Sequence, residues 1–146
     1  MNAGLVYLAQ SDTTAGLLSI NAKRLGELKG RAAGKPLLLC VASLDILKKF
    51  ARVPVKFRNR VRKARRTSFV YPNGRGIRVV KDRRHRRFLD CFGALYSTSA
   101  NRSGENFSLE FAKGACDVIV YDGVEIGEGN PSKIWYLGRE RCRKIR

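Results

Sequence analysis

Short apolar runs separated by polar turns recur along the chain and predict strands. The expected strands lie at residues 5–9, 36–41, 68–71, 76–80, 94–96, 118–121, 132–137 and 141–145. The turn Pro72-Asn73-Gly74-Arg75 between two of these runs predicts a β-hairpin. Two stretches of small and polar residues, 10–16 and 97–104, each follow an apolar run and predict loops.

Segments with one apolar face alternate with the strands and predict helices. The expected helices lie at residues 21–28, 43–51, 55–64, 82–92 and 108–115. Four of them begin at a residue that commonly caps a helix, namely Asn21, Ser43, Asp82 and Ser108. This alternation predicts an α/β fold class, with a twisted, open mixed sheet and helices on its faces. With 146 residues and no evident linker, we expect one domain over residues 1–146.

The charge balance points to a polyanionic partner. Thirty Lys and Arg against 12 Asp and Glu give a net charge of +18, and repulsion of that size favours binding to nucleic acid or to an anionic membrane. Between Lys48 and Arg87 there are 17 basic residues and one acid, Asp82. We expect salt-dependent contact with an RNA backbone, made by Lys56, Arg58, Arg60, Arg62, Lys63, Arg65 and Arg66. A merely solvated basic face is the alternative.

Several function classes fit the sequence poorly. The helix expected at 55–64 lacks the broad apolar face with bulky anchors that a membrane surface requires, so we expect no membrane partner. The four cysteines form no Cys-x-x-Cys pair, so we expect no metal site built from protein groups alone. His85 lies among arginines and is expected to be neutral and to face solvent or RNA. Without a signal-like N-terminus, we expect a cytoplasmic protein with reduced thiols.

Two kinds of loop are candidates for a nucleotide site. Lys29, Arg31 and nearby Lys35 follow a predicted helix, and Gly30 permits a bend that lets the cations converge on phosphate. Their alternative role, which spacing alone favours, is to complement the dipole at the helix C-terminus. The hydroxyl-rich loops 11–14 and 97–104 are predicted to share one crevice, although turns or helix caps would also explain them. No side-chain acid–base constellation is evident, which favours catalysis by positioning and charge stabilisation.

These residues resemble the YrdC-like family of threonylcarbamoyl-AMP synthases, which act in tRNA modification. Lys29-Gly30-Arg31 and Ser97-Thr98-Ser99-Ala100-Asn101 are similar to the family's Lys-x-Arg and Ser-x-Asn signature. The stretch 11–17 resembles its threonine loop, and weaker matches in the right order are Ile77-Arg78-Val79, Asp122-Gly123, Pro131-Ser132-Lys133-Ile134 and Lys144-Ile145-Arg146. The resemblance implies a YrdC/RibB-like fold with a basic concave surface.

The resemblance also implies a reaction and a role for each matching residue. ATP, L-threonine and bicarbonate would give threonylcarbamoyl-AMP and pyrophosphate, with Mg²⁺ arriving with ATP. A separate transferase complex would then modify tRNA. The catalytic residues would be Lys29, Arg31, Ser99 and Asn101. The nucleotide would be bound by these four together with Lys35, Ser97 and Arg146. Threonine would be placed by Ser11, Thr13 and Arg78.

The sequence departs from the family pattern at the threonine loop, and two other functions stay open. Gln10 replaces a proline and Ala15 replaces a tyrosine. One alternative is a YrdC-like protein that binds tRNA or rRNA with reduced or no catalysis. The other is a basic structural protein of a ribonucleoprotein particle, which would have no pocket between the two hydroxyl-rich loops.

Overall fold

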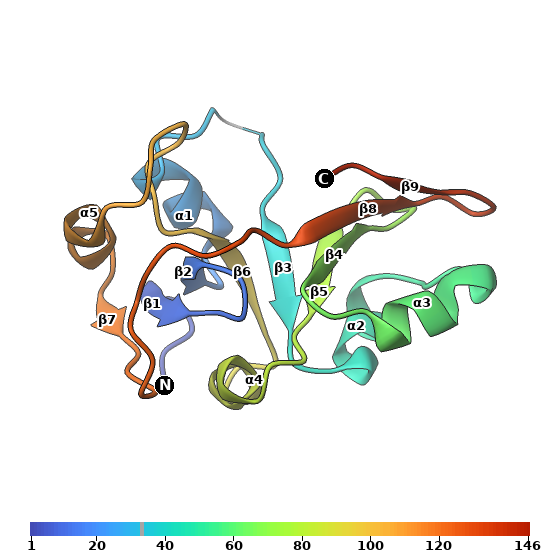
Figure 1. The fold of residues 1–146 in the computed structure, drawn as a ribbon, viewed down its shortest axis with the longest axis horizontal. Helices are drawn as coiled ribbons and strands as arrows, with labels where there is room; N and C mark the ends of the chain where they lie inside the picture. The colour runs from blue at the N-terminus through green and yellow to red at the C-terminus, as the bar shows by residue number, and fades with distance from the viewer. Residues whose placement is uncertain (33) are drawn as a thin grey trace.

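The described part of the chain, residues 1–32 and 34–146 of a computed structural model, forms a nine-stranded mixed sheet (Figure 1). The strands are β1 Tyr7–Gln10, β2 Ala15–Ser19, β3 Leu38–Val41, β4 Thr67–Val70, β5 Gly76–Val79, β6 Ala94–Ser99, β7 Val118–Ile119, β8 Lys133–Leu137 and β9 Cys142–Lys144. The helices are α1 Ala22–Leu28, α2 Leu44–Phe50, the 3₁₀ turn η1 Val55–Phe57, α3 Arg58–Lys63, α4 Arg83–Asp90 and α5 Leu109–Gly114.

The order of the strands brings distant segments together. It runs β7-β1-β2-β6-β3-β5-β4-β8-β9. Parallel pairs (β1 with β7, β3 with β5, β4 with β8) are mixed with antiparallel ones. Strand β6 lies between β2 and β3, so the segment that follows it reaches the end of α1. This mixed, open α/β sheet confirms the predicted fold class.

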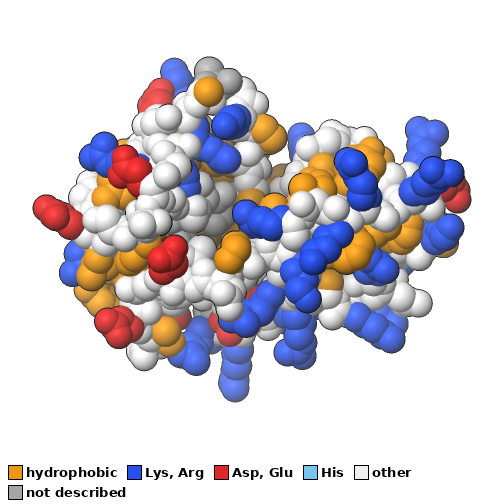
Figure 2. Space-filling view, turned by 45° about the horizontal axis from the view of Figure 1, so that its top comes forward, with side chains coloured by type: hydrophobic (Ala, Val, Ile, Leu, Met, Phe, Trp, Pro, Cys, Tyr) orange, Lys and Arg blue, Asp and Glu red, His pale blue; other side chains and the backbone are white. Residues whose placement is uncertain are grey.

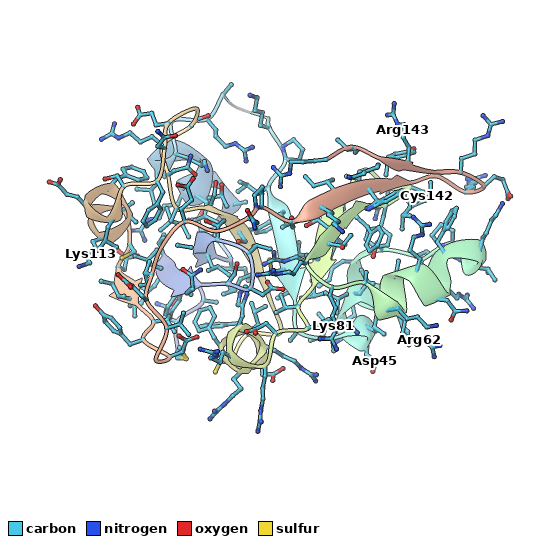
Figure 3. All side chains as sticks on the ribbon, in the orientation of Figure 1. Asp45, Arg62, Lys81, Lys113, Cys142 and Arg143 are labelled. Carbon is cyan, nitrogen blue, oxygen red and sulfur yellow. The ribbon has the colours of Figure 1, made fainter. Side chains whose placement is uncertain are left out.

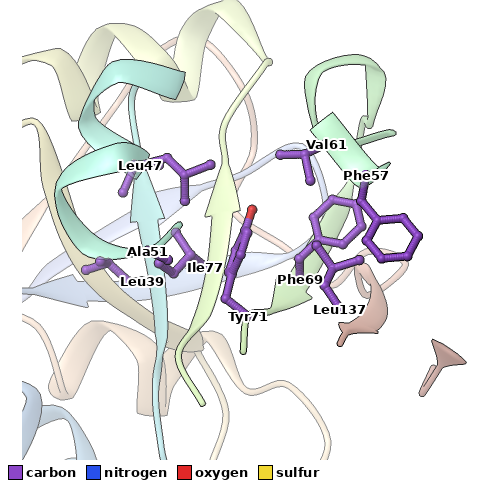
Figure 4. Close-up of a cluster of buried hydrophobic side chains, with 10 residues drawn as sticks. Leu39, Leu47, Ala51, Phe57, Val61, Phe69, Tyr71, Ile77 and Leu137 are labelled. Atoms are coloured by element: carbon purple, nitrogen blue, oxygen red, sulfur yellow. The ribbon is translucent and has the colours of Figure 1, made fainter. Parts of the chain in front are cut away.

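Separate groups of buried side chains hold the two halves of the sheet. In one half, Leu47 of α2 and Val61 of α3 pack on Leu39, Phe69 and Ile77 of the strands (Figure 4). In the other half, Val6, Leu8, Leu17 and Leu25 pack with the small residues of α5. A third cluster, which includes Leu18, Cys40 and Leu95, joins the two halves. Burial of apolar area is the main stabilising contribution, so the cleft described below lies on a continuously packed sheet.

The four predicted helix caps are confirmed. Side-chain oxygens of Asn21, Ser43, Asp82 and Ser108 each accept a hydrogen bond from the backbone N–H three residues later. Each cap satisfies an N–H group that the helix itself leaves without a partner. These local signals fix where α1, α2, α4 and α5 begin.

Several predicted boundaries were wrong. The expected loop 10–16 ends in β2, which is buried over its whole length between β1 and β6. A strand buried on both faces need not alternate apolar and polar residues, and Gly16 lacks the side chain that would have revealed it. Ser97, Thr98 and Ser99 belong to β6 rather than to the following loop, because they pair with β2.

Two further expectations also need correction. The helix predicted over 55–64 is divided into η1 and α3, and it ends at Lys63. His85 is buried, with 2% of its surface exposed, and does not face solvent or RNA. Its neighbours in α4 are basic, but the side chain lies on the inner face of the helix. Burial and Arg78 lower the pKa of His85 to about 3, which agrees with the predicted neutral imidazole.

Candidate active site

A single ammonium group joins the two predicted phosphate segments. Lys29 Nζ lies 2.8 Å from the carbonyl oxygen of Ser99, 2.6 Å from its Oγ and 3.1 Å from Oδ1 of Asn101. An ammonium group has three protons to donate, so these acceptors match its full capacity. The Lys-x-Arg and Ser-x-Asn segments therefore meet at one point in space.

Backbone geometry at the end of α1 produces this meeting. Gly30 has φ +62°, a left-handed conformation that ends a helix and is easily adopted by glycine. The turn lets the backbone N–H of Ser103 donate to the carbonyl oxygen of Lys29 at 3.1 Å. On the other side, the amide of Asn101 donates to the carbonyl oxygens of Arg102 and Glu105 at 2.9 and 2.7 Å. Local hydrogen bonds thus shape the segment after α1 and the segment after β6, and Lys29 joins the two.

The environment of Lys29 weakens its hold on a proton. The side chain is buried, and Arg31 adds a second positive charge nearby. Burial first, and repulsion by Arg31 second, lower the pKa of Lys29 to about 8. An anion bound beside this pair would favour the protonated form and raise that pKa again. Lys29 is therefore suited to respond to a bound phosphate.

A cleft of about 360 Å³ opens beside this junction. Among its described lining residues there are three arginines, Arg31, Arg78 and Arg146, and no Asp or Glu. Ser97 and Ser99 of β6 also line the cleft. Figure 2 shows the molecular surface hollowed near its centre, with basic side chains around the hollow. The electrostatics of the cleft thus favour an anionic ligand.

The three residues predicted to place threonine form a connected group in the same cleft. Ser11 Oγ lies 2.9 Å from Thr13 Oγ1, and Arg78 donates to that Thr13 oxygen at 2.9 Å. A second nitrogen of Arg78 lies 3.5 Å from the carboxylate of Asp12. Arg78 has 4% of its surface exposed, yet its buried Nε has no hydrogen-bond partner within the described residues. A buried donor without a partner is unusual in a folded protein.

Not every predicted nucleotide contact lines the cleft. Lys35 lies in an adjoining groove of about 600 Å³ that shares Arg31 with the cleft. Lys29 and Asn101 stand behind Ser99 and organise the segment rather than forming its lining. Arg146 lines the cleft, and its Nε donates to the carbonyl oxygen of Ser132 at 3.2 Å. The cleft thus gathers Arg31, Ser97, Ser99 and Arg146 directly.

Sequence reasoning missed two residues of this cleft, Ser68 and Ser132, and one residue beside it, Asp12. Ser68 and Ser132 are buried, with their hydroxyl oxygens 3.0 Å apart, and both line the cleft. Ser132 belongs to a segment that had been noted for its resemblance but not for a role, whereas Ser68 lies within a strand with no local signal. Asp12 could have been suspected, because it stands between Ser11 and Thr13 in the hydroxyl-rich loop.

The two departures from the family pattern contact the same glycine. Gln10 Oε1 accepts from the backbone N–H of Gly127 at 2.9 Å, and the N–H of Ala15 donates to the carbonyl oxygen of Gly127 at 3.0 Å. Gly127 belongs to residues 120–132, which we call the strap because they cross β1 and β2 on the way to β8 (Figure 1). The changed positions thus hold the strap against the threonine loop.

The basic residues predicted to bind RNA are all exposed, but they do not share one surface. Arg60 and Lys63 lie in a groove between α3 and the sheet. Arg62 points away from that groove, below α3 in the view of Figure 3. Arg66 is turned toward the threonine loop, where its Nε donates to the carbonyl oxygen of Asp12. The other three are Lys56, Arg58 and Arg65.

The described residues contain neither a metal-binding cluster nor a membrane-spanning helix. In that part of the chain, no group of three or more His, Cys, Asp or Glu side chains could hold a metal ion. No helix formed by those residues is long and apolar enough to cross a membrane.

Comparisons with known proteins identify the fold and the family. A model of the Sua5, YciO and YrdC proteins, described as telomere recombination, matches residues 4–146. The structure of Pyrococcus abyssi Sua5 in complex with L-threonine is 20% identical, with a TM-score of 0.79 over 98% of this chain and 50% of that one. Escherichia coli YciO is 20% identical, with a TM-score of 0.78 over 98% of this chain and 82% of that one.

A third structure is somewhat more similar in sequence. The protein MTH1692 from Methanobacterium thermoautotrophicum is 25% identical, with a TM-score of 0.70 over 98% of this chain and 80% of that one. The search of curated proteins found no match to this chain. The chain spans about half the length of the two Sua5 structures that it resembles.

Proposed function

The chain belongs to the Sua5/YciO/YrdC family, and we propose that it forms threonylcarbamoyl-AMP from ATP, L-threonine and bicarbonate. The observation that carries the proposal is the contact of Lys29 with Ser99 and Asn101, which brings both signature segments to one basic cleft. A threonine complex of P. abyssi Sua5, a protein of the same fold, supports the amino-acid substrate.

The proposed reaction requires little proton transfer from the protein. The threonine amine and bicarbonate combine to a carbamate with loss of water. A carbamate oxygen then attacks the α-phosphorus of ATP, and the bond to the β-phosphate oxygen breaks to release pyrophosphate. Negative charge accumulates on the phosphates during this step. Arg31 and Arg146 line the cleft where that charge would be stabilised, with Lys29 directly behind.

The residues of the cleft fit ATP with its magnesium ion. The described lining contains arginines and hydroxyl groups but no carboxylate. A metal ion would therefore be held mainly by the phosphates, with Ser99 as the proposed protein contact and Asn101 behind it, holding Lys29 in place. Bound to the phosphates, Mg²⁺ would neutralise part of their charge. Lys35, in the adjoining groove, would contact the outer phosphates.

Ser11, Thr13 and Arg78 would place threonine and its carbamate. The substrate has a carboxylate, an amine and a hydroxyl, and this group supplies two hydroxyls and a guanidinium. The carboxylate of Asp12, 3.5 Å from Arg78, holds the guanidinium in place. We further propose that the basic surface binds tRNA and that a separate transferase uses the product.

The direct test measures pyrophosphate release with ATP, threonine and bicarbonate, omitting each in turn. We expect release only when all three are present. Arg31→Ala should lower the rate about 100-fold, as loss of one preorganised charge-stabilising group commonly does. Arg87→Ala, which removes an exposed arginine of α4, is the matched control and should leave the rate unchanged. Release of pyrophosphate without threonine would contradict the proposal.

One observation favours a second candidate function, RNA binding without catalysis. All three donor protons of Lys29 are matched by acceptors of the protein itself. A lysine satisfied in this way can serve as a structural link alone. Binding of ATP and RNA with no pyrophosphate release under any substrate combination would favour this function.

A further inference from the structure

A second groove lies on the opposite face of the sheet from the cleft. It has a volume of about 440 Å³ and runs between α3 and strands β4 and β8. Side chains of a strand alternate between its two faces. Thr67 and Phe69 of β4 line this groove, whereas Ser68 and Val70 line the cleft. We call it the α3 groove.

Strand β8 obeys the same alternation. Lys133 and Trp135 line the α3 groove, and Ile134 between them lines the cleft. In β9, Cys142 lies on the α3 side and Arg143 points the other way (Figure 3). A change in the α3 groove can therefore be made without touching a residue of the cleft.

The wall of the α3 groove carries a flat stacking surface. The guanidinium carbon of Arg60 lies 4.6 Å from the ring centroid of Trp135, and one of its nitrogens lies 3.4 Å from Sγ of Cys142. Arg60 is thus held over the half-buried indole, while the side chain as a whole stays exposed. Aromatic rings and arginine planes are the surfaces on which proteins stack unpaired bases.

Cations stand beside this surface. Lys63 at the end of α3 and Lys133 at the start of β8 are both exposed and both line the groove. Neither forms an ion pair with a described acidic residue, and the described lining contains no Asp or Glu. Together with Arg60, they place three uncompensated charges around one aromatic ring. Phosphate groups would remove this repulsion.

We infer that the α3 groove binds single-stranded RNA, with a base stacked on Arg60 and Trp135 and the flanking phosphates held by Lys63 and Lys133. The volume lies within the range of about 300–1,000 Å³ typical of small-ligand pockets. The inference rests on the RNA-binding part of the proposed function and is independent of the catalytic part. RNA in the α3 groove and ATP in the cleft would then lie on opposite faces of the sheet.

The first test uses the fluorescence of Trp135, which is the single tryptophan of the chain. An oligouridylate should quench its emission saturably as it binds. A ribose-phosphate oligomer of the same length without bases should bind by charge but leave the emission unchanged. Binding of oligouridylate, measured by anisotropy, without a change in Trp135 emission would overturn the inference.

The second test separates the groove from general attraction by the +18 net charge. The double variant Lys63→Glu/Lys133→Glu should weaken oligouridylate binding at least about tenfold and flatten its salt dependence, because two phosphate contacts are lost. The control Arg84→Glu/Arg87→Glu changes the net charge equally on exposed α4 positions and should weaken binding much less. Equal losses in the two variants would mean nonspecific attraction and would overturn the inference.

Folding and catalysis are checked on the same samples. Trp135→Phe should retain most of the affinity for oligouridylate, and Trp135→Ala should lose it. The unfolding midpoints of both variants show whether each remains folded. Pyrophosphate release by Lys63→Glu/Lys133→Glu should equal that of the unmodified protein, because neither residue lines the cleft. A further outcome is that oligouridylate quenches Trp135 emission in the wild-type protein while no pyrophosphate is released. That result would contradict the proposed enzymatic activity but would support RNA binding in the α3 groove.

Discussion

At the scale of single residues, Lys29 has the most consequential position. It connects two segments 70 residues apart through an ammonium group with a lowered pKa. The sequence identified Lys29, Ser99 and Asn101 through their resemblance to a family signature. It could not indicate that Lys29 contacts the other two directly, because that contact depends on β6 lying next to β2.

The pKa of Lys29 predicts how ATP binding depends on pH. The group is mostly charged at pH 7 and mostly neutral at pH 9, because its pKa is about 8. ATP affinity should therefore fall as the pH rises between these values, by up to about tenfold if one charge contact is lost. Isothermal titration calorimetry at both pH values measures the change. The variant Lys29→Gln should bind ATP more weakly, and its ATP affinity should not fall between pH 7 and pH 9. An equal fall in ATP affinity in that variant would show that another group causes the pH dependence.

His85 provides a second prediction at this scale. Its pKa of about 3 in the folded protein lies below the ordinary value of 6.5, so the unfolded chain binds the proton more readily. The free energy of unfolding should thus decrease as the pH falls from 6.5 to 5, by roughly 1.5 kcal/mol. Urea denaturation at several pH values measures this slope, and His85→Gln should lack most of it. An unchanged slope in the variant would show that His85 is already solvated.

At the scale of secondary-structure elements, local signals predicted where four helices begin but missed β2 and shortened β6. Ser43 and Asp82 each cap the expected helix because capping depends on a few neighbouring residues. Strand β2 depends instead on burial between β1 and β6, which no local pattern records. The polar residues at the end of β6 predict a loop for the same reason, but in the structure they pair with β2.

The strap gives a prediction for the cleft. A Cβ at Gly129 would overlap the carbonyl oxygen of Thr13, whereas a Cβ at Gly127 would meet no atom within 4 Å. Gly129→Ala should therefore displace the threonine loop and weaken threonine binding at least about tenfold, an effect of more than 1.4 kcal/mol. Gly127→Ala is the matched control and should bind threonine normally. Equal threonine affinity in the two variants, measured by calorimetry, would mean that the strap does not position the loop.

At the scale of the whole molecule, one sheet separates two basic surfaces. Alternation along β4 and β8 sends one set of side chains to the cleft and the other to the α3 groove. The sequence predicted RNA contact from the density of positive charge, and that remains a prediction. It treated the cations of residues 56–66 as one surface, whereas Arg60 and Arg66 lie in different surroundings. Only the packing of α3 on the sheet distinguishes them.

We propose that the cleft joins threonine, bicarbonate and the adenylate of ATP in one molecule. Mass spectrometry of a reaction with ¹³C-bicarbonate tests this most directly. We predict one product that contains threonine, the labelled carbon and AMP, formed by the wild-type protein and strongly reduced in Arg31→Ala. ATP that binds but stays intact, or that is cleaved without incorporation of the labelled carbon, would contradict the account.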